Sequence, residues 1–359
     1  GQGMPQSGFA LLPYFPKARS FSNFLRQVFC ASRSPLYLWF YGWQGCSQGS
    51  SQYGVRIVTI PRIDFQKMIA GDAETLETIA YGARDVGFLT LENTPISGEA
   101  VQELIVLYRR FFKIDDAAKA AVDMARTGAN RGWGASKSEQ VDPKANPDYK
   151  QVFDCGLPVP DGDPMAHLPV YAPNLWPEAP EGFQETVEQY FAQARAVSLA
   201  LLAAIARAIG KDGDYFADKF DRPMALLRAN FYPPRPDWAG EKDFGIAAHT
   251  DYGCLTLLAT DGQAGLEVEM RDGSWLPVAV EPGVFVINFG EMLEMWSEGG
   301  VKATLHRVTG GAEERISIPL FFNPNYDANV APAGSDQVIR AGDHLSRRYA
   351  ETYLHMKTA

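Results

Sequence analysis

Residues 245–259 read GIAAHTDYGCLTLLA, and this stretch decides how the second half of the chain folds. Two short β-rich runs, 245–250 and 255–259, are separated by a turn. His249 and Asp251 stand two residues apart, so on a strand both side chains leave the same face. The stretch therefore predicts neighbouring strands that present an imidazole and a carboxylate together.

The same β-rich texture extends over the chain from Met224 onward, with Gly, Pro and Asp turns between the runs. The other runs that we predict as strands are 225–232, 266–270, 284–288, 304–308 and 315–322. Strands at this spacing are typical of a closed or sandwiched antiparallel fold, for which a jelly roll is a common solution. The tail, 343–356, has the pattern of a helix.

The first half of the chain mixes helices and strands. We predict strands at 56–65 and 87–91, helices at 73–86, 97–124 and 181–209, and a proline-rich extended excursion at 142–180. Ser97 is a plausible N-cap for the second helix. In the third helix apolar residues recur at three- and four-residue steps, which indicates a helix that supports the core.

The first 54 residues differ in composition from the rest. They are rich in Ser, Gln, Gly and aromatic residues, and they contain no Asp or Glu. This composition predicts a leader, such as an organelle transit segment, and the alternatives are an added segment or a disordered stretch. We therefore divide the chain into 1–54, an N-terminal region at 55–180, and a catalytic region with its support helix and C-terminal helix at 181–359.

Charge and cysteine content narrow the class of protein. Residues 1–63 carry six basic and no acidic side chains, so the other 296 residues carry 27 basic and 43 acidic ones. An acidic body repels phosphate backbones, and we expect no nucleic-acid partner. The dense apolar stretches are too short to span a membrane. Four cysteines without CxxC spacing indicate a reducing compartment. We expect a cytoplasmic monomer or weak oligomer, with organelle targeting by 1–54 as the alternative.

A third residue completes a set that suits iron. His306 lies 57 residues after His249, on a separate predicted strand. Two imidazoles and one carboxylate on one face of a metal form the facial triad of non-haem iron(II) oxygenases. Such a triad leaves open positions for a chelating cosubstrate and O2. A single His-x-Asp pair is a weak signal by itself.

Two further pairs of residues strengthen this reading. Arg315 and Ser317 share one face of a predicted strand, and a guanidinium beside a hydroxyl is suited to bind a carboxylate. Asn230 and Tyr232 also share a face, and they can supply polar contacts to the same anion. Each pair alone is more often structural, but their joint occurrence in one β-rich half favours a cosubstrate site.

At this point the sequence resembles a known family. The motifs that carry the resemblance are, in chain order, IPRIDF, ARDVGFLTLENTPIS, NFYPP, HTDYGCLTLL, GLEV, WLPV, LHRV and RISIP. They are similar to those of the isopenicillin N synthase-like branch of the Fe(II)/2-oxoglutarate-dependent dioxygenases, over roughly residues 57–359. The resemblance implies a mainly β fold with flanking helices: a distorted double-stranded β-helix (jelly roll) core with an N-terminal α/β region packed on it.

The resemblance also implies a chemistry. His249, Asp251 and His306 would be the iron ligands and catalytic residues, Arg315 and Ser317 would hold 2-oxoglutarate, and Asn230 and Tyr232 would also contact it. With O2, such an enzyme oxidises, most often hydroxylates, a small organic molecule and releases succinate and CO2. Two alternatives stay open here: an iron oxidase of the same fold that does not use 2-oxoglutarate, and a catalytically silent ligand-binding relative.

Candidate substrate contacts are fewer and less specific. Arg131 and Trp133 lie in an RGWG stretch where relatives often have a turn near the pocket mouth, and Phe322 and Asn323 follow the cosubstrate strand. Each has packing as its alternative, and for Phe322 we favour core packing. Glu291 stands where many members of the family have Asp, and we expect it to support a turn.

Overall fold

The structure is a computed structural model that describes residues 59–352 except 141, 143, 161, 241 and 333. All of these residues belong to one compact unit, Ile57–Ala359. The expectations for residues 1–54 lie outside the described part of the chain.

Strands and helices alternate in the first half, and strands predominate in the second. The described strands are β1 Arg62–Asp64, β2 Phe88–Glu92, β3 Gly132–Gly134, β4 Gln151–Gly156, β5 Met224–Tyr232, β6 Ile246–His249, β7 Leu255–Thr260, β8 Leu266–Glu269, β9 Trp275–Val278, β10 Phe285–Phe289, β11 His306–Val308 and β12 Arg315–Asn323. The α-helices are α2 Phe65–Ala70, α3 Ala73–Tyr81, α4 Gly98–Phe112, α5 Asp116–Lys119, α6 Phe183–Ala208, α7 Glu291–Trp296 and α8 Ala341–Thr352.

The strands form two sheets. The larger has the order β1-β2-β10-β7-β12-β5-β4-β3, and the smaller has the order β6-β11-β8-β9. Every pairing between these strands is antiparallel except that of β1 with β2. Residues of both sheets line one pocket between them. This is the predicted double-stranded β-helix with an N-terminal α/β region packed on it.

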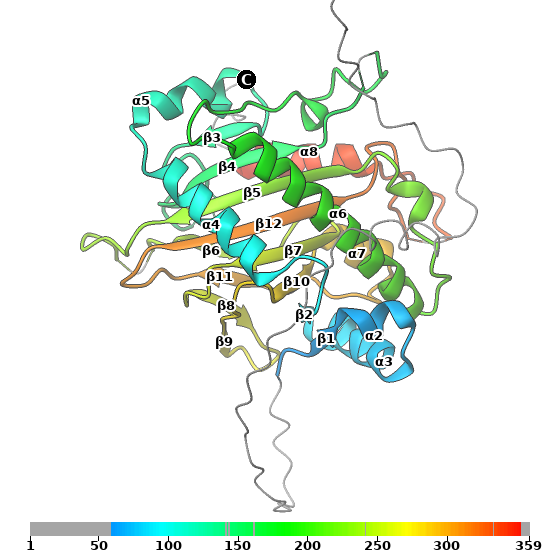
Figure 1. The fold of residues 1–359 in the computed structure, drawn as a ribbon. Helices are drawn as coiled ribbons and strands as arrows, with labels where there is room; N and C mark the ends of the chain where they lie inside the picture. The colour runs from blue at the N-terminus through cyan, green and yellow to red at the C-terminus, as the bar shows by residue number, and fades with distance from the viewer. Residues whose placement is uncertain are drawn as a thin grey trace, which may run out of the picture. The chain divides into compact units, whose positions relative to one another are not determined.

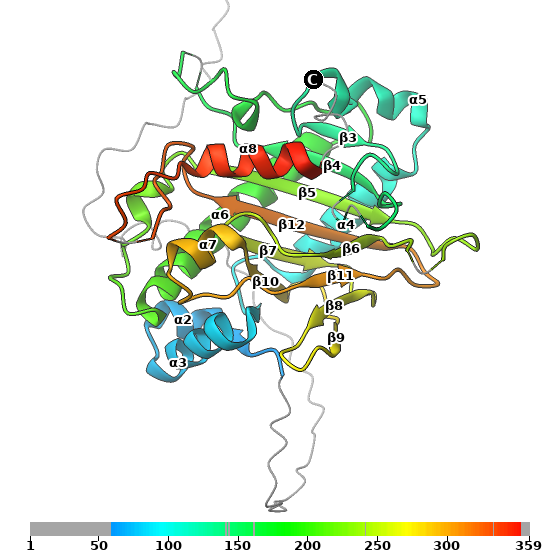
Figure 2. The same ribbon diagram turned by 180° about the vertical axis from the view of Figure 1, so that it is seen from behind.

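Two helices cover the outer face of the larger sheet. Figure 1 shows α4 and α6 crossing in front of β5, β12 and β7, and Figure 2 shows the smaller sheet and α8 on the opposite side. α4 begins where predicted, because the Ser97 side chain accepts a hydrogen bond from the Ala100 backbone amide. By length and composition α6 is apolar enough to cross a membrane, yet 56% of that stretch is buried within the protein. It serves here as the core helix that its spacing predicted.

Two sequence-based expectations about the first half need correction. The helix predicted over 97–124 ends at Phe112, because Asp115 caps a new short helix, α5, with its side chain. The excursion predicted over 142–180 contains β4, which pairs with β5 over six residues. The pairing partner of β4 lies about 75 residues away, so local composition carries no signal for this strand.

Candidate functional site

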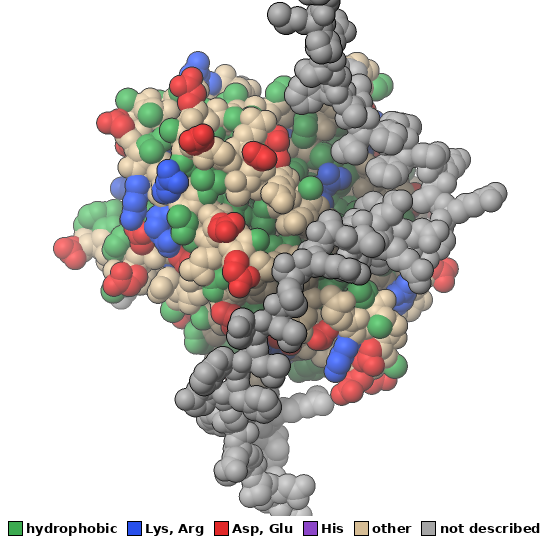
Figure 3. Space-filling model, in the orientation of Figure 1, with side chains coloured by type: hydrophobic (Ala, Val, Ile, Leu, Met, Phe, Trp, Pro, Cys, Tyr) green, Lys and Arg blue, Asp and Glu red, His purple; other side chains and the backbone are tan. Residues whose placement is uncertain are grey.

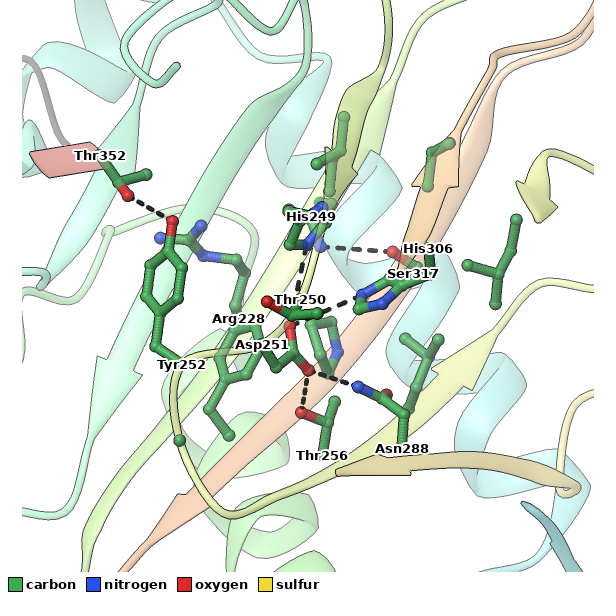
Figure 4. A pocket seen from close by; sticks show the side chains of 18 of the residues that line it. Arg228, His249, Thr250, Asp251, Tyr252, Thr256, Asn288, His306, Ser317 and Thr352 are labelled. Atoms are coloured by element: carbon green, nitrogen blue, oxygen red, sulfur yellow. Dashed lines mark hydrogen bonds and ion pairs between the residues drawn. The ribbon is translucent and has the colours of Figure 1, made fainter. Parts of the chain in front are cut away.

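The predicted iron ligands converge at one end of the pocket. His249 ends β6, Asp251 lies in the turn that follows, and His306 begins β11, where it pairs directly with His249. Their ligand atoms all lie within 4.8 Å of one another. Asp251 Oδ1 lies 3.8 Å from His249 Nε2 and 3.6 Å from His306 Nε2. Figure 4 shows the three side chains pointing toward one another.

Hydrogen bonds behind the three residues fix their orientation. The Nδ1 atoms of His249 and His306 lie 2.8 and 3.0 Å from the backbone oxygens of Ala247 and Thr304. A nitrogen that faces a carbonyl oxygen carries the proton, so both Nε2 lone pairs face the centre of the triad. Together with Asp251 Oδ1 they form the two-nitrogen, one-oxygen donor set that suits Fe(II).

The second oxygen of Asp251 is held separately. Its Oδ2 accepts hydrogen bonds from Asn288 Nδ2 at 2.6 Å and from the Thr256 hydroxyl (Figure 4). Close packing also fixes the turn after Asp251, since a Cβ at Gly253 would collide with the Asn323 side chain. The carboxylate therefore presents Oδ1 to the metal position in one orientation.

The pKa values of His249 and Asp251 favour a bound cation, whereas the contact with Asp251 raises the pKa of His306 against the opposing effect of burial. Burial lowers the pKa of His249 to about 4, and the nearby His306 acts on it in the same direction. Burial alone would raise the pKa of Asp251, but the neighbouring imidazoles and the Thr256 hydroxyl hold it well below its usual range. At neutral pH the site thus offers an ionised carboxylate and a neutral His249 imidazole.

The predicted cosubstrate residues lie together on the inner face of the larger sheet. Arg315 pairs with Tyr232 and Ser317 pairs with Asn230 across the β12–β5 ladder. Asn230 Nδ2 lies 3.3 Å from Ser317 Oγ, which lies 3.4 Å from the Tyr232 hydroxyl. The Arg315 guanidinium lies 5.2 Å from the centre of the Tyr232 ring. All four line the pocket that contains the triad.

Arg315 is a buried cation without an anion. Its side chain is 3% exposed, and among the described residues it has no carboxylate partner. Its Nε donates to the Gln263 backbone oxygen, and its Nη1 is buried without a hydrogen-bond partner. Leaving such a group unpaired costs several kcal/mol, so the site is built to receive an anion. A carboxylate of 2-oxoglutarate fits this requirement.

Beside the triad the pocket has an ionic border that we call the charged cluster: Glu139, Asp148, Lys150, Asp154 and Arg228. Lys150 Nζ lies 2.8 Å from Glu139 Oε2 and 2.9 Å from Asp148 Oδ2. Arg228 donates two hydrogen bonds to Asp154, from Nε to Oδ1 at 2.8 Å and from Nη2 to Oδ2 at 2.6 Å. It also forms an ion pair with Glu139. Glu139, Lys150 and Arg228 line the pocket directly.

The candidate substrate contacts separate into three groups. Asn323 lines the pocket, where its side-chain oxygen accepts a hydrogen bond from the Cys254 backbone amide. Trp133 and Phe322 point to the other face of the larger sheet and pack in the core, Phe322 against Phe220 at 5.0 Å. Arg131 lines a neighbouring pocket and not the one that contains the triad. The packing alternative is therefore the one that holds for Trp133 and Phe322.

Sequence reasoning missed several residues that shape the site. Asn288 had a visible signal, since it is the one polar residue in the apolar strand FVINF. Arg228 continues the alternation of Asn230 and Tyr232 toward the same face. Glu139 had no local signal. Glu291, which the sequence did single out, begins α7. As expected it supports a turn, because its carboxylate accepts the hydrogen of the Thr250 hydroxyl directly after β6, and it also pairs with Arg348 at 3.2 Å.

The pocket, the triad and the unpaired arginine define the class: a mononuclear non-haem iron oxygenase on a jelly-roll fold. Comparison with known proteins agrees. Residues 223–324 match the 2OG-Fe(II) oxygenase superfamily, and residues 60–179 match the family described as "non-haem dioxygenase in morphine synthesis N-terminal".

Individual relatives cover most of the chain. Homoarginine-6-hydroxylase 2-ODD-233 of Oryza sativa subsp. japonica is 31% identical over 283 residues, which are 76% of this chain and 85% of the relative. The 2-oxoglutarate-dependent dioxygenase tropC of Talaromyces stipitatus is 30% identical over 316 residues, 82% of this chain and 95% of that protein. The crystal structure of a full-length Neurospora crassa protein in complex with alpha-KG is 29% identical, with a TM-score of 0.74, and the match covers 83% of this chain and 98% of that one.

The chain therefore belongs to the Fe(II)/2-oxoglutarate-dependent dioxygenases. It is an oxidoreductase that uses Fe(II), 2-oxoglutarate and O2 to oxidise a small organic molecule. The predicted family and cofactors are confirmed, and the comparisons support the 2-oxoglutarate-dependent reading over the oxidase alternative.

Proposed function

We propose that this enzyme hydroxylates an aliphatic carbon of a small polar molecule, with iron on His249, Asp251 and His306 and the far carboxylate of 2-oxoglutarate on Arg315 and Ser317. In the overall reaction one oxygen atom of O2 enters the substrate and the other enters succinate, while CO2 is released. Bound Fe(II) and 2-oxoglutarate together supply the oxidising power toward the C–H bond.

The observation that carries the assignment is the unpaired guanidinium of Arg315. The buried Arg315 guanidinium lies in the same pocket as the metal triad, with the Ser317 hydroxyl next to it. This arrangement favours an anion that pairs with Arg315 and is long enough to reach the metal position. A dicarboxylate with a 2-oxo group meets both demands, because one end pairs with Arg315 while the other chelates. Asn230 can take part as well, since rotation of its amide exchanges the unpaired Oδ1 for an N–H donor.

The protein's own residues orient the reactants and keep the site dry. Asn288 and Thr256 hold Asp251, and the backbone oxygens behind the two imidazoles hold the histidines. Apolar side chains around the metal position, among them Phe88, exclude bulk water.

The charged cluster supports a polar substrate. It offers donors and acceptors side by side in the same pocket as the triad, and Tyr252 adds an aromatic surface with a hydroxyl. The similar homoarginine-6-hydroxylases and the same N. crassa protein, solved also in complex with thymine, are relatives that act on or bind small polar molecules. We therefore infer an amino-acid-like or nucleobase-like substrate for this chain.

For partners, localisation and oligomeric state we propose what the sequence predicts. Acidic and basic side chains are interspersed on the visible face around α4 (Figure 3), which supports a partner other than nucleic acid or membrane. A cytoplasmic monomer or weak oligomer is our proposal for the folded unit.

The test is an anaerobic titration of the full chain with Fe(II) and 2-oxoglutarate, followed by the weak visible charge-transfer band of the chelate. We expect the band in the wild type and a large loss of 2-oxoglutarate affinity in Arg315→Ala. Arg222→Ala is the matched control, because Arg222 pairs with Asp163 at 2.9 Å, does not line the pocket, and should leave the band unchanged. Bound iron without the band in the wild type would refute the assignment.

A further inference from the structure

The aromatic ring of Tyr252 is held in a fixed position beside the metal ligands. Tyr252 directly follows Asp251 in the chain and lines the active-site pocket. Its hydroxyl is hydrogen-bonded to the Thr352 hydroxyl of α8 (Figure 4). The guanidinium of Arg348, also on α8, lies 4.3 Å from the centre of the ring. The ring is therefore fixed both at its hydroxyl end and by a cation on one face.

Arg348 lies on the side of the Tyr252 ring that is turned away from the pocket. Tyr252 belongs to the pocket lining, and Arg348 does not. Arg348 forms ion pairs with Glu291 at 3.2 Å and with Glu351 at 2.9 Å, so its own position is fixed. The Tyr252 side chain is only partly buried. Its accessible surface is therefore on the pocket side, next to the metal position.

A second aromatic ring borders the same space. Phe321 lines the pocket and is partly exposed, whereas its neighbour Phe322, a predicted substrate contact, packs in the core. On the larger sheet Phe321 lies opposite Thr256, whose hydroxyl holds Asp251. Neither Phe321 nor Tyr252 contacts another aromatic ring within the described part of the chain. The pocket thus has two aromatic side chains near the metal position, and neither is stacked on another ring.

The charged groups of the pocket offer no free carboxylate to a cationic substrate. Among the described residues that line it, the carboxylates are Glu139 and Asp251. Glu139 is already paired with Lys150 and Arg228, and Asp251 serves the metal. An ammonium or guanidinium group of a substrate would be buried here without a partner, which is costly. Of the two substrate classes in the proposed function, these contacts favour the neutral, nucleobase-like one.

We propose that Tyr252 is a substrate-binding residue, and that the substrate carries a neutral, planar heteroaromatic ring that stacks on the pocket side of Tyr252. Phe321 borders this ring, and Arg348 is a positioning residue that holds Tyr252 from behind. A side chain that is already fixed loses little conformational freedom when it binds, and stacking on it tolerates different ring substituents. The inference rests on the proposed function and names the part of the substrate that this pocket recognises.

The experiment compares uracil with dihydrouracil, which has the same carbonyl and N–H groups but no aromatic ring. Calorimetry on the full chain, loaded anaerobically with Fe(II) and 2-oxoglutarate, should show about tenfold tighter binding of uracil. Tyr252→Leu should remove most of this preference, and Tyr252→Phe should keep it because the ring remains. Phe321→Leu should reduce the preference. Phe322→Leu is the matched control, because Phe322 packs in the core, and it should leave the preference unchanged.

The positioning role of Arg348 is tested on the same two probes. Arg348→Met should reduce the preference for uracil and leave the Kd for 2-oxoglutarate unchanged, whereas Arg348→Lys, which keeps a cation behind the ring, should retain part of the preference. Arg347→Met, on the preceding residue of α8 and outside the pocket lining, is the matched control and should behave as the wild type.

Three outcomes would overturn the proposal: no uracil binding, equal affinities for uracil and dihydrouracil, or tighter binding of methylguanidinium than of uracil. A missing charge-transfer band with Fe(II) and 2-oxoglutarate would instead refute the proposed function. Calorimetry on the metal-free chain would still measure the preference for the aromatic ring, so the two failures can be told apart.

Discussion

Asn288→Ala tests whether the hydrogen bonds behind Asp251 build the metal site. Asn288 Nδ2 donates to Asp251 Oδ2 at 2.6 Å, and both side chains are buried. A hydrogen bond to a charged group contributes about 1.5–3 kcal/mol net. If the carboxylate loses this support and turns away from the two imidazoles, Fe(II) affinity should fall about 10- to 100-fold. Thr256 still holds the same oxygen, which favours the lower end of this range.

The assay is an anaerobic competition titration of Fe(II) between the protein and a coloured chelator. Asn325→Ala is the matched control, because buried Asn325 also donates to an aspartate, Asp221, and does not line the active-site pocket. It should lower thermal stability and leave the iron Kd unchanged. An iron Kd in Asn288→Ala within about threefold of the wild type would show that Asp251 is oriented by other contacts.

Three further substitutions test packing, ion pairing and capping. Because the Phe322 ring packs in the core, Phe322→Ala should lower the free energy of unfolding by about 3–5 kcal/mol. The KM for 2-oxoglutarate should stay unchanged. A raised KM together with normal stability would contradict this placement. Lys150→Met leaves the buried Asp148 carboxylate without its cation and should cost about 3–5 kcal/mol in urea unfolding at neutral pH, and a neutral effect would argue against an ionised pair. Hydrogen bonds from Thr75 lower the pKa of the Asp72 carboxyl in the folded protein. This N-cap therefore stabilises the fold at pH values above about 4, the pKa of an aspartate in the unfolded chain. The stabilisation disappears as the pH falls through the lowered pKa of Asp72 in the folded protein. The urea midpoint of Asp72→Asn should therefore decrease less than that of the wild type between about pH 5 and 3, and parallel curves would refute this assignment.

The pattern of predicted strands indicated much of the fold and which residues of the candidate site lie on common faces. Alternation placed Arg315 with Ser317 and Asn230 with Tyr232 on common faces, and the structure pairs these residues across β12 and β5. The same rule predicts that Arg228 shares this face, and Arg228 does line the same pocket.

The sequence-based predictions that were wrong concern features that depend on contacts between distant segments of the chain. β4 lies within residues that read as an extended excursion, and it becomes a strand because β5 supplies its hydrogen bonds. Trp133 and Phe153 pair across β3 and β4, and both are buried in the core on the helix-covered side of the larger sheet. A turn motif in the sequence could not reveal which side of this sheet Trp133 would face, because the strand itself was not predicted.

The sequence by itself determined the family, through its ordered motifs, and indicated the jelly roll. It also predicted the candidate metal triad and the candidate carboxylate receptor, because short spacings and period-two alternation place pairs of side chains together locally. Only the tertiary structure decided the charged cluster and the support of Asp251 by Asn288. Each of these joins residues from segments far apart in the chain, such as Glu139 with Arg228 or Asn288 with Asp251. Such contacts form when packing brings buried polar groups together, and their pairing is then enforced by the cost of leaving them without partners.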